Sequence, residues 1–150
     1  MTSPPGFVLD GSIALAWYFA DEADAYADEV GRQLPAVEAI VPTIWPLEVA
    51  NAVLMGERRK RSTPAQAATW ISHLLTLPIT VDGETSAHAL GAILNLARMQ
   101  SLSAYDAAYL ELAMRRGLPL ATLDDQLKVA AAAVGVPLFV PPPPPGTGTP

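Results

Sequence analysis

Four acidic residues stand beside segments that predict strand ends or helix starts. They are Asp10, Glu48, Asp106 and Asp124. Asp10 ends an apolar segment, and Asp124 follows another; Glu48 and Asp106 fall in the first turns of two predicted helices. The carboxyl ends of parallel strands and the N-termini of the following helices meet at one edge of an α/β sheet. We therefore expect the four carboxylates to converge there.

Carboxylates gathered in this way suit a hard divalent cation. The sequence has no cysteine, and its two histidines, His73 and His88, are not spaced as a ligand pair, so Mg²⁺ or Mn²⁺ is favoured over zinc. One or two such ions can activate a water and stabilise an in-line attack at phosphorus, which is nuclease chemistry. The chain has 15 acidic residues, and an acid in a first helical turn also favours the helix dipole, so the prediction depends on the set of four.

The helix predicted around Asp106 indicates where the side chain of this residue points. At about 100° per residue, Asp106 lies about 140° around the helix from Glu111. Glu111 and Arg115 form an i,i+4 pair of the kind found on solvated faces. Asp106 is thus expected to point away from solvent, where other carboxylates share a cation with it.

The rest of the sequence alternates short apolar segments with longer helical ones. The predicted strands are 7–10, 37–41, 79–81, 119–122 and, at the end, 137–140; the predicted helices are 11–19, 21–34, 46–61, 64–77, 84–100, 103–117 and 124–135. Ser12 is a possible N-cap, and Asp125 is assigned a helix-capping role. Strands joined by helices of this length predict an α/β fold, with a mainly parallel, short-stranded sheet flanked by helices on both faces.

Length and composition predict one globular domain, residues 1–140, followed by a proline-rich disordered tail, 141–150. The net charge of −6 argues against a protein that coats nucleic acid through bulk electrostatics. The absence of cysteine fits a reducing compartment, and we find no signal peptide or membrane span, so a cytoplasmic protein is expected.

Four segments together resemble a known family. They are FVLDGSIALAWYF, PTIWPLEVANAVL, LSAYDAAYLELAMRRGLPLATLDDQL and AAAAVGVPLF, which occur in this order over roughly residues 7 to 140. They look like the PIN-domain ribonucleases, specifically the VapC-type toxins of bacterial toxin–antitoxin pairs. The most specific pieces are YDAAYLELA and ATLDDQL, with the early LD.S and PLEVANA.

The resemblance implies a PIN fold, RNA cleavage dependent on Mg²⁺ or Mn²⁺, a homodimer, and inhibition by a cognate antitoxin. It assigns the metal-binding and catalytic roles to the same four acids. Ser12 and Thr122 are implied as hydroxyls that orient ligands or water. Asn51, at i+3 from Glu48, is a further supporting residue for that carboxylate or the substrate.

The only basic run is ERRKR, which contains Arg58, Arg59, Lys60 and Arg61. It is either a solvated helix end that favours the dipole, or a contact for RNA phosphates or an acidic antitoxin segment. The three tryptophans, Trp17, Trp45 and Trp70, are expected in the core or a dimer interface and not as base-stacking platforms.

Two kinds of alternative remain open, namely a phosphate-handling domain of another family and a domain without catalytic activity. A haloacid-dehalogenase-type phosphatase also begins with an aspartate after its first strand, but it needs a second aspartate two residues on, where this sequence has Ser12. A receiver domain needs an early acidic pair and a late lysine, which are not evident. The other alternative is a catalytically silent PIN-like domain that binds RNA or a partner, against which the presence of all four acids argues.

Overall fold

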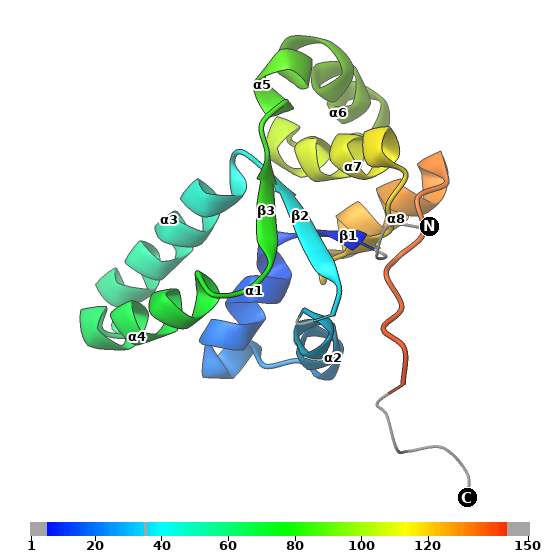
Figure 1. Ribbon diagram of the computed structural model, residues 1–150. Coiled ribbons are helices and arrows are strands. Elements are labelled where there is room, and N and C mark those ends of the chain that lie inside the picture. Colours follow the sequence, from blue (N-terminus) through cyan, green and yellow to red (C-terminus); the bar gives the residue numbers. More distant parts are fainter. Residues whose placement is uncertain (1–5, 35, 144–150) are drawn as a thin grey trace, which may run out of the picture.

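A four-stranded parallel sheet forms the centre of the computed structural model, which describes residues 6–34 and 36–143 (Figure 1). The strands are β1 (Gly6–Leu9), β2 (Glu38–Pro42), β3 (Ile79–Asp82) and β4 (Leu120–Ala121), in the order β3-β2-β1-β4. Val8 pairs with Ile40 on one side and Leu120 on the other. Buried side chains of β1 and β2 are continuous, as expected for strands covered on both faces.

The helices follow the strands as crossover connections. They are α1 (Gly11–Tyr18), α2 (Ala25–Gln33), α3 (Trp45–Arg58), α4 (Pro64–Leu74), α5 (Thr85–His88), α6 (Leu94–Gln100), α7 (Ala104–Arg116) and α8 (Asp125–Val134), with short turns η1 (Ala20–Glu22) and η2 (Ala89–Ile93). Thr63 closes a capping box on α4, and the Ser103 hydroxyl caps α7. The predicted α/β class is confirmed.

Helix α7 is the element that links the sheet to the rest of the core. It contacts β1, β2 and β4, and α6 and α8 pack beside it. Helix α1 contacts α2 and α3. In Figure 1, α5, α6 and α7 lie at the top of the molecule, whereas α1 to α4 lie below and to the left of the strands. Within the described ranges, no helix has the length and apolar character needed to cross a membrane.

Several predicted boundaries were wrong. The helix expected over 21–34 starts only at Ala25, because Asp24 caps it after the η1 turn. The helix expected over 46–61 ends at Arg58, since Lys60 has a φ of 59°. A π-helical turn interrupts the helix expected over 84–100. The expected last strand is a single bridge between Leu120 and Leu138. The predicted tail falls largely on 144–150, outside the described residues.

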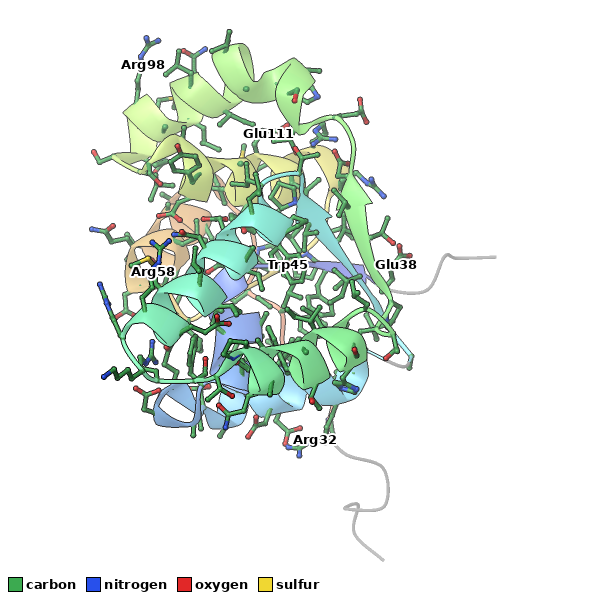
Figure 2. The ribbon with its side chains drawn as sticks, turned by 90° about the vertical axis from the view of Figure 1, so that its left-hand side faces the viewer. Arg32, Glu38, Trp45, Arg58, Arg98 and Glu111 are labelled. Carbon is green, nitrogen blue, oxygen red and sulfur yellow. The ribbon has the colours of Figure 1, made fainter. Side chains whose placement is uncertain are left out.

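The predicted solvated face of α7 is also wrong. Glu111 is 7% exposed, and its carboxylate accepts hydrogen bonds from Arg115, as the i,i+4 spacing predicts. Arg115 also donates to both carboxylate oxygens of Asp82 at 3.2 Å, and Arg116 donates to Asp82 at 3.1 Å. Glu111 and Arg115 are not on a solvated face because Arg115 also binds Asp82 and so connects the end of β3 to α7. The helical periodicity of the sequence cannot reveal a partner as distant as Asp82. Figure 2 labels Glu111 between α6 and α7.

The tryptophans lie in the core, as expected. Trp45 is buried at the start of α3, and Trp17 and Trp70 are partly buried against the same core. The Trp70 ring stacks on Tyr18 at a centroid distance of 4.6 Å.

Candidate active site

Asp10 lies at the end of β1 and is 8% exposed. Its Oδ2 accepts hydrogen bonds from the hydroxyls of Ser12 and Thr122, each at 2.7 Å. The register explains the contact with Thr122: Leu9 pairs with Ala121, so the residues after β1 and β4 are neighbours. Ser12 is therefore not the N-cap of α1. That position is Asp10, and the Ser12 hydroxyl instead holds the Asp10 carboxylate.

The two hydroxyls are themselves held by the loop after β4. The Ser12 Oγ accepts from the Leu123 N–H at 3.0 Å, and the Thr122 Oγ1 accepts from the Asp124 N–H at 3.0 Å. Each hydroxyl thus accepts from the loop and donates to Asp10. This network fixes the Asp10 carboxylate and joins α1 to the loop that carries Asp124.

Glu48 lies in the first turn of α3 and is partly exposed. Its Oε1 accepts a hydrogen bond from the phenol of Tyr109, which comes from α7. Pro46 is the second residue of α3, close to the start that the sequence predicts, and this start places Glu48 at the same edge of the sheet as Asp10. Asn51 is exposed and makes no side-chain hydrogen bond with the described residues, so its supporting role stays a prediction.

Asp106 and Asp124 stand at the starts of α7 and α8. Asp106 is partly exposed, one turn after the Ser103 cap. Asp124 is the N-cap of α8: its Oδ1 accepts from the Leu127 N–H at 2.9 Å. The capping role predicted for Asp125 is therefore wrong. The Asp125 side chain is 97% exposed in the first turn.

The four acids act on one another electrostatically. Burial raises the pKa of Asp10, and the charge of Asp124 raises it further, although the hydroxyls of Thr122 and Ser12 lower it. Burial also raises the pKa of Glu48, with contributions from Asp10 and Asp106. The pKa of Asp106 is raised by burial, by Asp10 and by Asp124. Every member of the predicted set is thus within electrostatic reach of another member.

The donor chemistry of this cluster fits a hard divalent cation, because all its ligands are oxygens. As the side chains lie in the described part of the chain, however, no three acidic or histidine groups form a ready cage for an ion. Three of the four carboxylates already accept hydrogen bonds from protein donors: Asp10 from two hydroxyls, Glu48 from Tyr109, and Asp124 from the backbone of α8. Side-chain rotation would have to bring the carboxylates onto one ion.

The basic run divides into two parts. Arg61 donates to Asp21 at 2.7 Å and to Glu22 at 2.6 Å, and its guanidinium lies 3.9 Å from the centre of the Phe19 ring. The other three, Arg58, Arg59 and Lys60, are exposed and form no ion pair with the described residues. Figure 2 shows Arg58 at the far end of α3 from Trp45.

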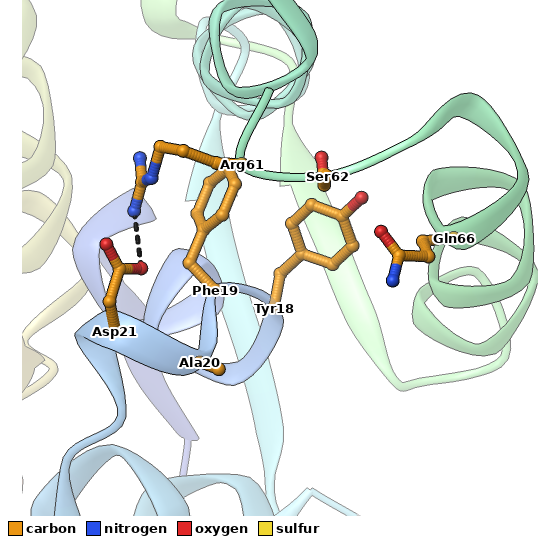
Figure 3. A pocket seen from close by; sticks show the side chains of 7 residues that line it. All are labelled: Tyr18, Phe19, Ala20, Asp21, Arg61, Ser62 and Gln66. Carbon is orange, nitrogen blue, oxygen red and sulfur yellow. Dashed lines mark hydrogen bonds and ion pairs between the residues drawn. The ribbon is translucent and has the colours of Figure 1, made fainter. Parts of the chain in front are cut away.

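A pocket of about 370 Å³ surrounds Arg61 but contains none of the four acids (Figure 3). It is lined by Tyr18, Phe19, Ala20, Asp21, Arg61, Ser62 and Gln66. It lies where the end of α1 meets the turn between α3 and α4. The acids instead lie at the other ends of α1 and α3 and at the starts of α7 and α8.

Tyr109 is the residue of this site that the sequence did not reveal. It lies three residues after Asp106 and is 0% exposed. A tyrosine in an apolar helix face is typical of a core residue, so its type gave no indication of the contact with Glu48. The i+3 spacing from a predicted ligand was the available clue.

Comparison with known proteins agrees with the fold. The structure is similar to the crystal structure of PAE2754 from Pyrobaculum aerophilum, with a TM-score of 0.62, 22% identity and 87% of each chain covered. A segment of 68 residues is 35% identical to the Gag polyprotein of Simian foamy virus (isolate chimpanzee), over 43% of this chain and 10% of that protein. The chain thus spans about a tenth of that polyprotein, whose activities are not carried over.

The sequence matches the PIN domain family over residues 7–133. This range begins at the second residue of β1 and ends within α8, so it contains all four strands and all four acids. The family is one of nucleases that typically use divalent metals. The chain belongs to the PIN domain family.

Proposed function

We propose that this protein is an endoribonuclease dependent on Mg²⁺ or Mn²⁺ and that it acts as the toxin of a toxin–antitoxin pair. The observation that carries the proposal is the electrostatic coupling of Asp10, Glu48, Asp106 and Asp124 at one sheet edge, in a chain of the PIN family. Carboxylates that raise one another's pKa are costly without a cation, so an uncompensated cluster argues for a ligand.

Each acid has a definite position in the proposed reaction. Asp10, buried and held by Ser12 and Thr122, is the most fixed ligand; Glu48 and Asp106 flank it from α3 and α7, and Asp124 completes the set. A divalent cation bound by these groups would supply Lewis acidity for hydrolysis of a phosphodiester bond. The hydroxyls of Ser12 and Thr122 hold Oδ2 of the Asp10 carboxylate in place.

The partners in this proposal are RNA, a cognate antitoxin and a second copy of the chain. The exposed Arg58, Arg59 and Lys60 lie at the end of α3, the helix whose first turn carries Glu48. Eleven residues of helix span about 16 Å, a distance that an RNA strand crosses in a few nucleotides. We therefore assign the phosphate contact to these three residues, while Arg61 holds the turn onto η1.

Cleavage of a mixture of unstructured RNAs tests the reaction. We expect internal cleavage in Mg²⁺ or Mn²⁺, loss of cleavage in EDTA, and recovery when the metal is restored in excess. Asp10→Asn should abolish cleavage, whereas Asp125→Asn, an equal change at an exposed acid, should retain it. Undiminished cleavage in EDTA would contradict metal dependence, and binding of RNA without cleavage would favour the catalytically silent alternative.

Expression in a bacterial host tests the toxin role. The parent protein should stop growth, the Asp10→Asn variant should not, and co-expression of a small antitoxin encoded next to the gene should restore growth. Normal growth with abundant folded parent protein would contradict the toxin role without contradicting the nuclease activity. The two assays therefore separate the reaction from its biological use.

A further inference from the structure

The phenol of Tyr109 lies in the middle of the acidic cluster. The residue is 0% exposed on α7, and its hydroxyl donates to Oε1 of Glu48 on α3. A methyl group added at Gly11 would lie 3.9 Å from the phenol oxygen, so the hydroxyl also lies beside the backbone that follows Asp10. It thus stands between the end of β1 and the first turn of α3.

The hydrogen bond from the phenol engages only one oxygen of the Glu48 carboxylate. Among the described residues, Oε2 of Glu48 accepts no side-chain hydrogen bond, so one oxygen of this carboxylate is held and the other is available.

We propose that Tyr109 is a positioning residue for the metal site: it takes Oε1 of Glu48 and so presents Oε2 to the cation. This inference rests on the proposed function, because it assigns Glu48 as a metal ligand. Donors behind a ligating carboxylate fix its orientation and raise affinity for the ion.

The arrangement also couples two ligands through one helix. Asp106 and Tyr109 are one turn apart on α7, so a displacement of α7 moves the Asp106 carboxylate and, through Tyr109, the Glu48 carboxylate together. This hydrogen bond joins α7 to α3. Tyr109 acts through Glu48 and not on the substrate.

Calorimetric titration with Mn²⁺ tests the role without relying on activity. We expect the parent to bind Mn²⁺ and Tyr109→Phe, which deletes one hydroxyl, to bind it ten- to a hundredfold more weakly. The matched control is Tyr105→Phe, the same change one turn earlier on α7 at a side chain that is 63% exposed; its affinity should equal the parent's.

A double variant shows whether Tyr109 acts through Glu48. Glu48→Gln with Tyr109→Phe should bind Mn²⁺ no more weakly than Glu48→Gln alone. If Tyr109→Phe does not fold, the Tyr105→Phe control allows a second measurement. Mn²⁺ should change the tyrosine absorbance of this folded control, and adding Glu48→Gln to it should remove that change.

The outcomes are distinct. A parent that binds no Mn²⁺ overturns both the metal-dependent function and this inference. A parent that binds, with unchanged or tighter binding in Tyr109→Phe, overturns the positioning role alone. Effects of the two substitutions that simply add would also overturn it, since Tyr109 would then act independently of Glu48.

Discussion

At the residue scale, the site is built from groups whose charge is unfavourable in the folded protein. Asp106 shows this most clearly, because burial, Asp10 and Asp124 all raise its pKa. A carboxyl whose folded pKa is raised contributes stability below its ordinary pKa of 3.8, and this contribution is lost as the pH rises through the folded pKa. At neutral pH, Asp106 therefore opposes folding in the absence of metal.

The unfavourable contribution of the Asp106 charge leads to a prediction for Asp106→Asn, which removes the charge and nearly preserves the shape of the side chain. Urea unfolding at pH 7 without metal should show the variant to be as stable as the parent or more stable. Its advantage should shrink as the pH is lowered, because the parent carboxyl is then neutral too. Destabilisation by more than about 1 kcal/mol, a typical cost for losing a helix cap, would instead make Asp106 a structural residue.

A bound metal ion should stabilise the parent more than the Asp106→Asn variant, which is the opposite of the order expected without metal. An ion that binds only the folded parent at about a hundred times its dissociation constant stabilises it by about 2.7 kcal/mol. We expect Mg²⁺ to raise the melting temperature of the parent and to raise that of Asp106→Asn much less. Equal shifts in both proteins would remove Asp106 from the set of ligands.

At the element scale, α7 is fixed at both ends, by Tyr109 near the site and by an ion network at its far end. Asp82 is 5% exposed, and burial would raise its pKa, but the hydrogen bonds from Arg115, the Glu84 N–H and Arg116 hold the pKa below 3.8. A depressed pKa means that Asp82 stabilises the fold above its ordinary pKa and loses this effect as the pH falls through the folded value.

Removal of Arg115 should therefore be costly. Arg115→Met leaves the buried carboxylates of Asp82 and Glu111 without their main partner, and breaking a buried pair in this way costs on the order of 3 kcal/mol. Arg32→Met is the control, since its partner Glu29 is on the surface and such pairs contribute about 0–1 kcal/mol. Similar losses in chemical unfolding of the two variants would contradict a buried network.

Close packing of α3 on the end of α1 gives a second prediction for an element. A Cβ at Gly56 would lie 2.6 Å from two atoms of the Phe19 ring, whereas one at Gly91 meets nothing within 4 Å. Gly56→Ala should destabilise the protein by about 1–3 kcal/mol through overpacking. Gly91→Ala should be neutral or slightly stabilising in thermal unfolding. A neutral Gly56→Ala would show that the two helices separate easily.

The same elements show how far the sequence could be interpreted. Four of the strands and most helix starts follow from local patterns, and so do the positions of the four acids after strands or in first helical turns. The contacts of Tyr109 with Glu48 and of Arg115 with Asp82 do not, because each joins residues more than 25 positions apart in sequence. The capping role went to Asp124 and not Asp125 because the backbone at Asp124 is extended.

At the scale of the whole molecule, the protein and its proposed substrate, RNA, both carry a net negative charge. With a net charge of −6, the chain repels RNA at long range, so binding must depend on a local cationic surface. Of the nine basic residues, Arg32, Arg61, Arg115, Arg116 and Lys128 form ion pairs with described residues, which leaves Arg98 and the three exposed residues Arg58, Arg59 and Lys60.

Salt dependence measures that local surface. Each phosphate contact to a single strand contributes about 0.7 to the slope of log affinity against log salt. Replacing Arg58, Arg59 and Lys60 with Gln should therefore reduce the slope by up to about 2 when RNA binding is measured with Asp10→Asn to prevent cleavage. Arg98→Gln, also an exposed arginine without an ion pair, should leave the slope unchanged. If the triple change leaves the slope intact but abolishes antitoxin binding, the basic residues belong to the protein partner; if it alters neither, they are a solvated helix end.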